Sequence, residues 1–153
     1  MAGILVVGYG NELRGDDGVG PAVARRVEEL CLVGVQTMAL HQLAPELAEA
    51  IAAVRAVIFV DARPISSSGT VEVIALEPDV ECGIRTHTSN PRSLLALANA
   101  LFGRSPPAWL VAVPGTCFDL VEGLSPLARA GVAGAVEEIR RLWTSLLPVS
   151  EAT

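Results

Sequence analysis

The first twenty residues contain the feature that most constrains the fold. A short apolar run, Ile4 to Val7, is followed by glycines and then by apolar residues at helical spacing, which predicts a buried strand, a loop and the start of a helix. The glycines allow the loop to turn tightly and to approach a ligand closely. Asp16 and Asp17 place two carboxylates at the edge of that turn. The loop is therefore a candidate for metal binding or acid–base chemistry.

Two other interpretations of this loop have to be weighed. The first is structural, because Asp is an ordinary turn and N-cap residue, and we expect one of the two aspartates to cap the following helix. The second is a dinucleotide-binding loop, because Gly8-x-Gly10 follows a strand. That motif lacks its third glycine, since Leu13 occupies the position. The acidic residue expected after the second strand is also missing, since that strand runs into Leu40-His41-Gln42.

The complete segment from Gly8 to Gly20 reads Gly-Tyr-Gly-Asn-Glu-Leu-Arg-Gly-Asp-Asp-Gly-Val-Gly. This pattern resembles the signature of the hydrogenase maturation proteases, the endopeptidases that trim the C-terminal tail from the large subunit of nickel-iron hydrogenases. The resemblance extends over nearly the whole chain, although only this first motif is highly specific.

Composition favours one α/β domain spanning residues 1–153. The chain is 51% hydrophobic but only 4% aromatic, so its core has to be built mainly from Val, Leu, Ile and Ala, as in the apolar strands of parallel sheets. Strand-like and helix-like segments alternate along the chain, which predicts a three-layer α/β/α sandwich. We expect a hydrolase- or phosphorylase-like fold whose twisted, mostly parallel sheet has about five strands, one of them an antiparallel edge strand.

The individual elements are predicted from periodicity and from capping residues. Ser89 or Asn90 is expected to cap the helix that begins at Pro91, and Ser125 the last helix. The predicted helices are Val19–Leu30, Leu43–Val54, Pro91–Phe102 and Pro126–Leu146, and the predicted strands are Ile4–Val7, Val33–Leu40, Ala56–Val60, Thr70–Leu76 and Trp109–Val113.

Charge and apolar runs bear on the partners of the protein. A net charge of −6 opposes nucleic-acid binding, which requires a basic face. No apolar run approaches the roughly 20 residues that span a bilayer, and the N-terminus lacks the pattern of a signal peptide. We therefore expect a soluble, cytoplasmic protein. We also expect it to be a monomer.

The three cysteines, Cys31, Cys82 and Cys117, are odd in number and far apart. They indicate neither a disulfide framework nor a zinc knuckle, and we expect them to be reduced. Cys117 follows Gly115-Thr116 near a strand end and could be a nucleophile, but a small buried apolar role is the commoner one for such a residue.

A second carboxylate stands in a position that needs an explanation. Asp61 directly follows five apolar residues, where an ionised side chain needs a partner or a metal ion. A salt bridge to Arg63 would be the structural answer. Ligands of open parallel sheets, however, bind beyond the carboxyl ends of the strands, and both Asp61 and the first loop are predicted there.

The resemblance implies a site formed by Asp17, Asp61 and His87, which act as metal ligands and catalytic residues. Some members of the family have glutamate where Asp17 stands. Two carboxylates and one imidazole suit nickel or zinc, and zinc or cadmium could occupy such a site in crystals. Secondary candidates are Asp16, Asn11 and His41, of which Asp16 fits a helix cap or a supporting role and His41 a solvated strand end.

The function that the resemblance implies is removal of the C-terminal extension of a nickel-iron hydrogenase large-subunit precursor after nickel insertion. The enzyme would be a nickel-dependent endopeptidase, with nickel bound by the chain itself or supplied with the precursor. The chain has neither a Gly-x-Ser-x-Gly elbow nor a His-Glu-x-x-His helix, which favours direct hydrolysis over an acyl-enzyme. Two alternatives remain open: a nickel checkpoint protein that binds the precursor without cutting it, and a nucleotide-binding α/β module.

Overall fold

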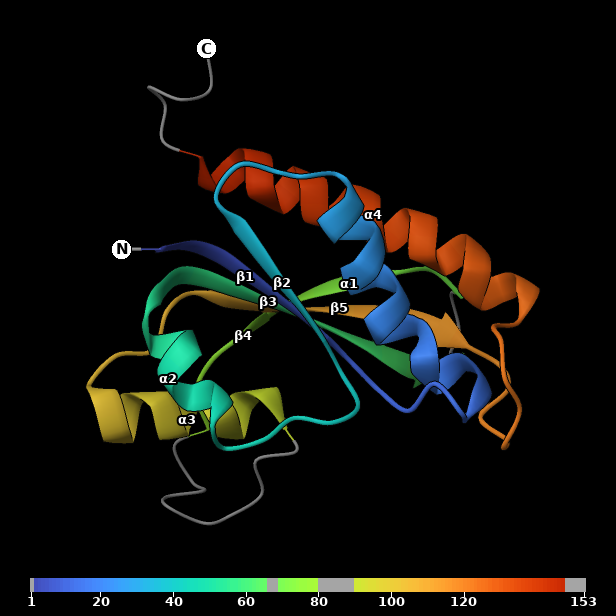
Figure 1. The fold of residues 1–153 in the computed structure, drawn as a ribbon, viewed down its shortest axis with the longest axis horizontal. Helices are drawn as coiled ribbons and strands as arrows, with labels where there is room; N and C mark the ends of the chain where they lie inside the picture. Colours follow the sequence, from blue (N-terminus) through green and yellow to red (C-terminus); the bar gives the residue numbers. More distant parts are fainter. Residues whose placement is uncertain (1, 66–68, 80–89, 148–153) are drawn as a thin grey trace.

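A five-stranded sheet in the order β2-β1-β3-β5-β4 forms the centre of the molecule (Figure 1). The computed structural model describes residues 2–65, 69–79 and 90–147. The strands are β1 (Ala2–Tyr9), β2 (Val35–Leu40), β3 (Val54–Pro64), β4 (Glu72–Leu76) and β5 (Ala108–Gly115). β4 pairs antiparallel with β5 at one edge, and the other pairings are parallel. The predicted sheet is therefore confirmed.

Helices cover both faces of this sheet, as predicted (Figure 1). One face packs against α1 (Val19–Glu29) and α4 (Pro126–Leu146), and the other against α2 (Leu47–Ala52) and α3 (Pro91–Phe102). Because side chains of a strand alternate between faces, Ile58 faces α1 and α4, whereas Val57 and Phe59 face α2 and α3. The same alternation sends Asp61 to the α2/α3 face.

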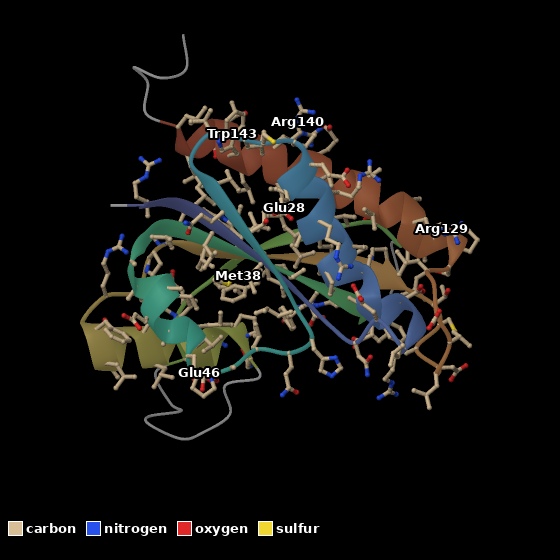
Figure 2. The ribbon with its side chains drawn as sticks, in the orientation of Figure 1. Glu28, Met38, Glu46, Arg129, Arg140 and Trp143 are labelled. Atoms are coloured by element: carbon tan, nitrogen blue, oxygen red, sulfur yellow. The ribbon has the colours of Figure 1, made fainter. Side chains whose placement is uncertain are left out.

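Polar contacts stabilise the ends of two helices. Asn90 caps α3 by accepting a hydrogen bond from the backbone N–H of Arg92, at 2.8 Å. Near the end of α4, the indole N–H of Trp143 donates to the carbonyl of Val33, at 2.9 Å, and Figure 2 shows Trp143 on that helix. On the other face, Met38 of β2 packs against the apolar cluster beneath α2 and α3 (Figure 2).

None of the helices within the described ranges is long and apolar enough to span a membrane.

The order of the strands in the sheet reverses direction at β1, and the candidate site is expected beside this reversal. β1 lies between β2 and β3, and the helices that follow β1 and β2 cover opposite faces. In open α/β sheets, such a reversal opens a crevice at the carboxyl ends of the strands. The loop after β1 and the last part of β3 lie at that edge of the sheet.

The structure differs from the sequence-based predictions at several element boundaries, and three of these differences have a physical reason. β3 does not end at Asp61: its pairing with β1 stops at Val60, but its pairing with β5 continues to Pro64. The second helix is Leu47–Ala52 rather than Leu43–Val54, because Val54 already pairs with β1. The second strand begins at Val35 rather than Val33, after Gly34 has adopted a positive φ of 77°.

Candidate active site

The turn after β1 folds back tightly over the end of its own strand. Gly10 has a φ of 149° and a backbone that faces Asp17, and a Cβ at this position would overlap the carbonyl oxygen of Asp17. Gly8 packs in the same way against the backbone of Gly20 at the start of α1. Only glycine allows both approaches. The tight turn predicted from the sequence is therefore present, and Asp17 occupies the space that its glycines leave.

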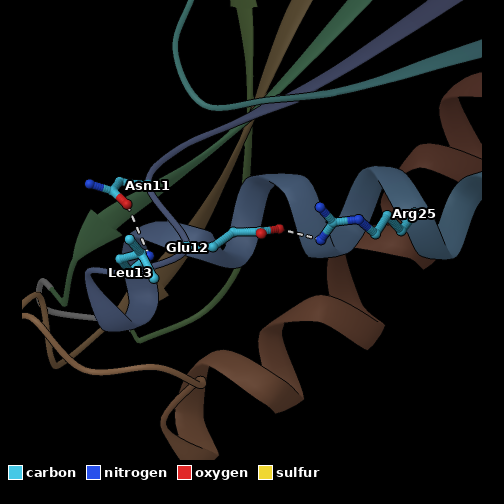
Figure 3. A network of polar contacts seen from close by, with 4 residues as sticks. All are labelled: Asn11, Glu12, Leu13 and Arg25. Carbon is cyan, nitrogen blue, oxygen red and sulfur yellow. Dashed lines mark hydrogen bonds and ion pairs between the residues drawn. The ribbon is translucent and has the colours of Figure 1, made fainter.

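Backbone and side-chain contacts of Asn11 set the position of Asp17. The N–H of Asn11 donates to Oδ2 of Asp17 at 2.7 Å, and the Asn11 side chain accepts from the N–H of Leu13 at 2.9 Å (Figure 3). The second contact is the side-chain turn that Asn favours. Asn11, a secondary candidate in the sequence, thus shapes the turn and orients the half-buried carboxylate of Asp17.

Asp61 lies on β3, one residue beyond the last pairing with β1. Its carboxylate accepts a hydrogen bond from the hydroxyl of Tyr9 and one from the N–H of Ala62, at 2.8 Å. Burial raises the pKa of Asp61 to about 6, the two hydrogen bonds counteract part of this effect, and the charge of Asp17 adds to the increase. The pKa of Tyr9 is also raised, by burial first and then by the neighbouring Asp61. The charge of Asp17 is therefore close enough to act on the pKa of Asp61.

The pair of carboxylates carries negative charge that no ion pair compensates within the described part of the chain. Arg63 forms no ion pair with Asp61, although its charge partly lowers the pKa of that group. A buried carboxyl beside a second carboxylate is an environment that a divalent cation stabilises. The oxygen donors of Asp17 and Asp61 fit such an ion chemically. The described residues contain no cluster of three His, Cys, Asp or Glu side chains that could hold a metal, and the expected third ligand, His87, lies outside them.

Asp16 points away from this pair and is completely buried, with 0% exposure. Its Oδ2 accepts from the N–H groups of Thr116 and Cys117, at 2.7 and 3.1 Å, and from the hydroxyl of Ser125, at 2.7 Å. Its Oδ1 accepts from the N–H of Ser125 at 2.7 Å. Burial alone would raise the pKa of Asp16, but these hydrogen bonds outweigh it and hold the pKa below its ordinary value.

The prediction that one aspartate caps the first helix is therefore wrong. Gly18 is the N-cap of α1 and makes no side-chain cap bond, and Asp16 and Asp17 lie in the 3₁₀ turn Gly15–Gly18 that precedes it. The reason is that stronger partners compete for both side chains. Asp16 binds the loop between β5 and α4, and Asp17 binds Asn11.

Comparisons with known proteins support the same family resemblance. Neither a protein-family profile nor a curated protein sequence matches the chain. Solved structures do match: the hydrogenase maturating endopeptidase HybD from E. coli has a TM-score of 0.76 at 24% identity, over 93% of this chain and 92% of that one. The [NiFe] hydrogenase maturation protease HycI from Thermococcus kodakarensis has a TM-score of 0.68 at 26% identity, over 93% and 92%. HybD from T. kodakarensis has a TM-score of 0.71 at 23% identity, over 91% and 97%. The chain has the fold of the hydrogenase maturation endopeptidases. The resemblance indicated by the Gly8–Gly20 motif is thereby confirmed.

Within this maturation-endopeptidase fold, the remaining candidates lie around the carboxylate pair. His41 follows β2, is exposed, and lines a hollow of about 220 Å³ together with Gly10, Asn11 and Leu13. It forms no three-ligand cluster with Asp17 and Asp61. Cys117 is half-buried and free of disulfides, and its backbone, rather than its thiol, contacts Asp16.

One contributor to the site was missed in the sequence. Tyr9 donates a hydrogen bond to Asp61, yet it looked like an ordinary residue at the end of an apolar strand. The signal was available in the register, because Gly8 pairs with Val60 in parallel strands, so the next residues, Tyr9 and Asp61, follow side by side. Alternation along each strand puts both side chains on the same face.

Proposed function

We propose that this chain is an endopeptidase that removes the C-terminal extension of the large-subunit precursor of a nickel-iron hydrogenase after nickel has been inserted. The observation that carries the proposal is the fold shared with hydrogenase maturation endopeptidases. The effect of the Asp17 charge on the pKa of Asp61 supports the choice of these two residues. A third ligand, His87, is part of the proposal because the motif resemblance implies it. The cleavage would be the last step of active-site maturation in the client enzyme.

The metal of this proposal is nickel, which reaches the site with the precursor. Asp17 and Asp61 would bind it through carboxylate oxygens, and His87 through its imidazole. An ion bound there would supply Lewis-acid polarisation of the scissile carbonyl or of a water molecule. Dependence on correctly inserted nickel would follow, because a precursor without the ion gives the carboxylates nothing to hold.

The residues of the chain itself prepare the site for that event. Asn11 keeps the Asp17 carboxylate in place through its N–H, and Tyr9 does the same for Asp61 through its hydroxyl. With a pKa of about 6, Asp61 is largely ionised at neutral pH and is therefore able to coordinate a cation or accept a proton. Fixed ligands of this kind reduce the reorganisation needed when the substrate binds.

The nucleotide-binding alternative has little support in the geometry of the turn. The space beside Gly10 is taken by the carbonyl of Asp17, where a nucleotide-binding loop leaves room for phosphate. Two carboxylates, those of Asp16 and Asp17, also precede the N-terminus of α1, and their charge opposes an anion at that position. A checkpoint protein that binds without cutting would use the same residues, and activity separates it from a protease.

The experiment is incubation of the purified protein with nickel-loaded and nickel-free precursor, followed by mass spectrometry of the products. We expect loss of the C-terminal extension from the nickel-loaded form only. Asp17→Ala, Asp61→Ala and His87→Ala should each abolish the cut, whereas Glu49→Ala, which removes an exposed carboxylate on α2, should leave it intact. Failure of the wild type to cut either form would refute the protease function, and normal cutting by all three variants would refute the site.

A further inference from the structure

Two loops beside the carboxylate pair are joined into one unit. Residues 11–18 follow β1, and residues 116–125 connect β5 to α4. The N–H of Gly15 donates to the carbonyl of Val121 at 2.8 Å, and the N–H of Asp16 to the carbonyl of Cys117 at 2.7 Å. The buried carboxylate of Asp16 adds its contacts to the same loop. The second loop is therefore held in a fixed position relative to Asp17.

These joined loops expose large apolar side chains. Leu120 is 80% exposed, Leu13 is 59% exposed and Val121 is 48% exposed. Single exposed apolar residues are common, but these three occur on loops whose backbones are fixed by hydrogen bonds. Leu13 also lines the 220 Å³ hollow beside Gly10 and Asn11, next to the turn that positions Asp17. A patch of this kind is typical of a surface that another protein covers.

The charge of the two loops indicates what kind of partner fits. Their sequences contain four acidic residues that are not completely buried, Glu12, Asp17, Asp119 and Glu122, and a single basic one, Arg14. Glu12 is paired with Arg25 of α1 (Figure 3), but Asp119 and Glu122 are exposed and flank Leu120 and Val121 directly. An apolar patch bordered by basic side chains would complement this surface. A second copy of the chain would bring the same negative charges against each other, which disfavours self-association through these loops.

We propose that Leu13, Leu120 and Val121 form a docking surface for the folded body of the polypeptide substrate, which presents an apolar patch with basic borders. This inference rests on the proposed function, since the substrate is the large-subunit precursor. The surface lies outside the carboxylate pair, so it contributes to binding of the precursor rather than to peptide-bond cleavage. Substrate recognition is thereby divided between the metal-binding carboxylates and this surface.

The test measures binding and cleavage of the nickel-loaded precursor separately. Leu13→Ser and Leu120→Ser are each compared with Leu101→Ser, which removes a side chain of similar exposure (61%) from the solvent face of α3. We expect Leu120→Ser and Leu13→Ser each to weaken binding and to raise KM by about 10-fold, as for an interface anchor. Their kcat should stay near that of the wild type, and Leu101→Ser should change neither quantity.

Each outcome distinguishes the docking surface from the proposed function. If the wild type binds the precursor without cutting it, the protease function fails, but a loss of binding in Leu120→Ser still supports the docking surface. Unchanged binding in both loop variants overturns the docking surface even where cutting is normal. An equal loss of binding in Leu101→Ser also overturns it. A third contradicting result is a wild-type protein that sediments as a dimer while Leu120→Ser sediments as a monomer, because a second copy of the chain would then cover the patch.

Discussion

Replacing the buried Asp16 with Asn removes the central connection between the turn after β1 and the loop before α4. The carboxylate accepts four hydrogen bonds, three on Oδ2 and one on Oδ1. An amide has only one acceptor oxygen, so its NH₂ group has to face either the N–H of Ser125 or the N–H groups of Thr116 and Cys117. At least one partly buried donor then loses its partner, and the remaining hydrogen bonds lose the assistance of the negative charge.

The expected loss of unfolding free energy is about 3 kcal/mol at pH 7. One unpaired buried donor costs about 1–3 kcal/mol, and weakening of the other hydrogen bonds adds to this. Urea unfolding followed by circular dichroism measures the change. The control is Asp119→Asn in the connected loop, where the side chain is exposed and a change within about 0.5 kcal/mol is expected. A loss below 1 kcal/mol in Asp16→Asn would show that Asp16 does not hold the loops together.

The difference in unfolding free energy between the wild type and Asp16→Asn depends on pH in a defined way. The pKa of Asp16 is lowered in the folded state, so its stabilising contribution is present above its ordinary value of 3.8 and is lost as the pH falls through the lower folded value. The stability difference between wild type and Asp16→Asn should therefore be constant near neutral pH and shrink only in acid. A difference that grew in acid would contradict this sign.

Two further predictions concern the candidate site. Because the pKa of Asp61 rises from 3.8 to about 6 on folding, its neutral form stabilises the protein at low pH, and this contribution is lost as the pH rises through 6. In metal-free buffer at pH 7, the unfolding free energy of Asp61→Asn should therefore exceed that of the wild type by about 2–3 kcal/mol. The difference should vanish below about pH 4. Urea unfolding that shows Asp61→Asn to be less stable than the wild type at pH 7 would contradict this prediction. Tyr9→Phe removes a hydrogen bond that lowers the pKa of Asp61, so an NMR titration of that carboxyl should give a pKa above 6, and an unchanged or lower value would mean that Tyr9 does not support Asp61.

Much of the fold could be predicted because its signals are local. The apolar runs of β1, β3 and β5, the helical period of α1 and the caps at Asn90 and Ser125 all lie within short stretches of sequence. Boundaries were less certain where tertiary pairing decides them. β3 extends past Asp61 only because β5 offers partners as far as Gly115, and no residue near Asp61 signals that extension.

The site could be predicted in part for a related reason. The expectation that Asp17 and Asp61 lie at the same edge of the sheet followed from the general position of ligands at the carboxyl ends of parallel strands and from the motif resemblance. The effect of the Asp17 charge on the pKa of Asp61 agrees with that expectation. The contacts of Asp16 could not be predicted, because its partners Thr116, Cys117 and Ser125 stand about a hundred residues away. Tyr9 required the register of β1 with β3, which single-strand patterns do not contain. The part of the prediction that concerns His87 stays a prediction.

Anomalous X-ray scattering at the nickel edge, from crystals grown with Ni²⁺, tests most directly whether Asp17 and Asp61 form one metal site. We expect a single strong peak between the two carboxylates, at about 2.0–2.2 Å from an oxygen of each, as for other divalent first-row ions, and with the imidazole of His87 as the third protein ligand. Peaks confined to other positions, such as the exposed His41, with none between Asp17 and Asp61, would contradict the account.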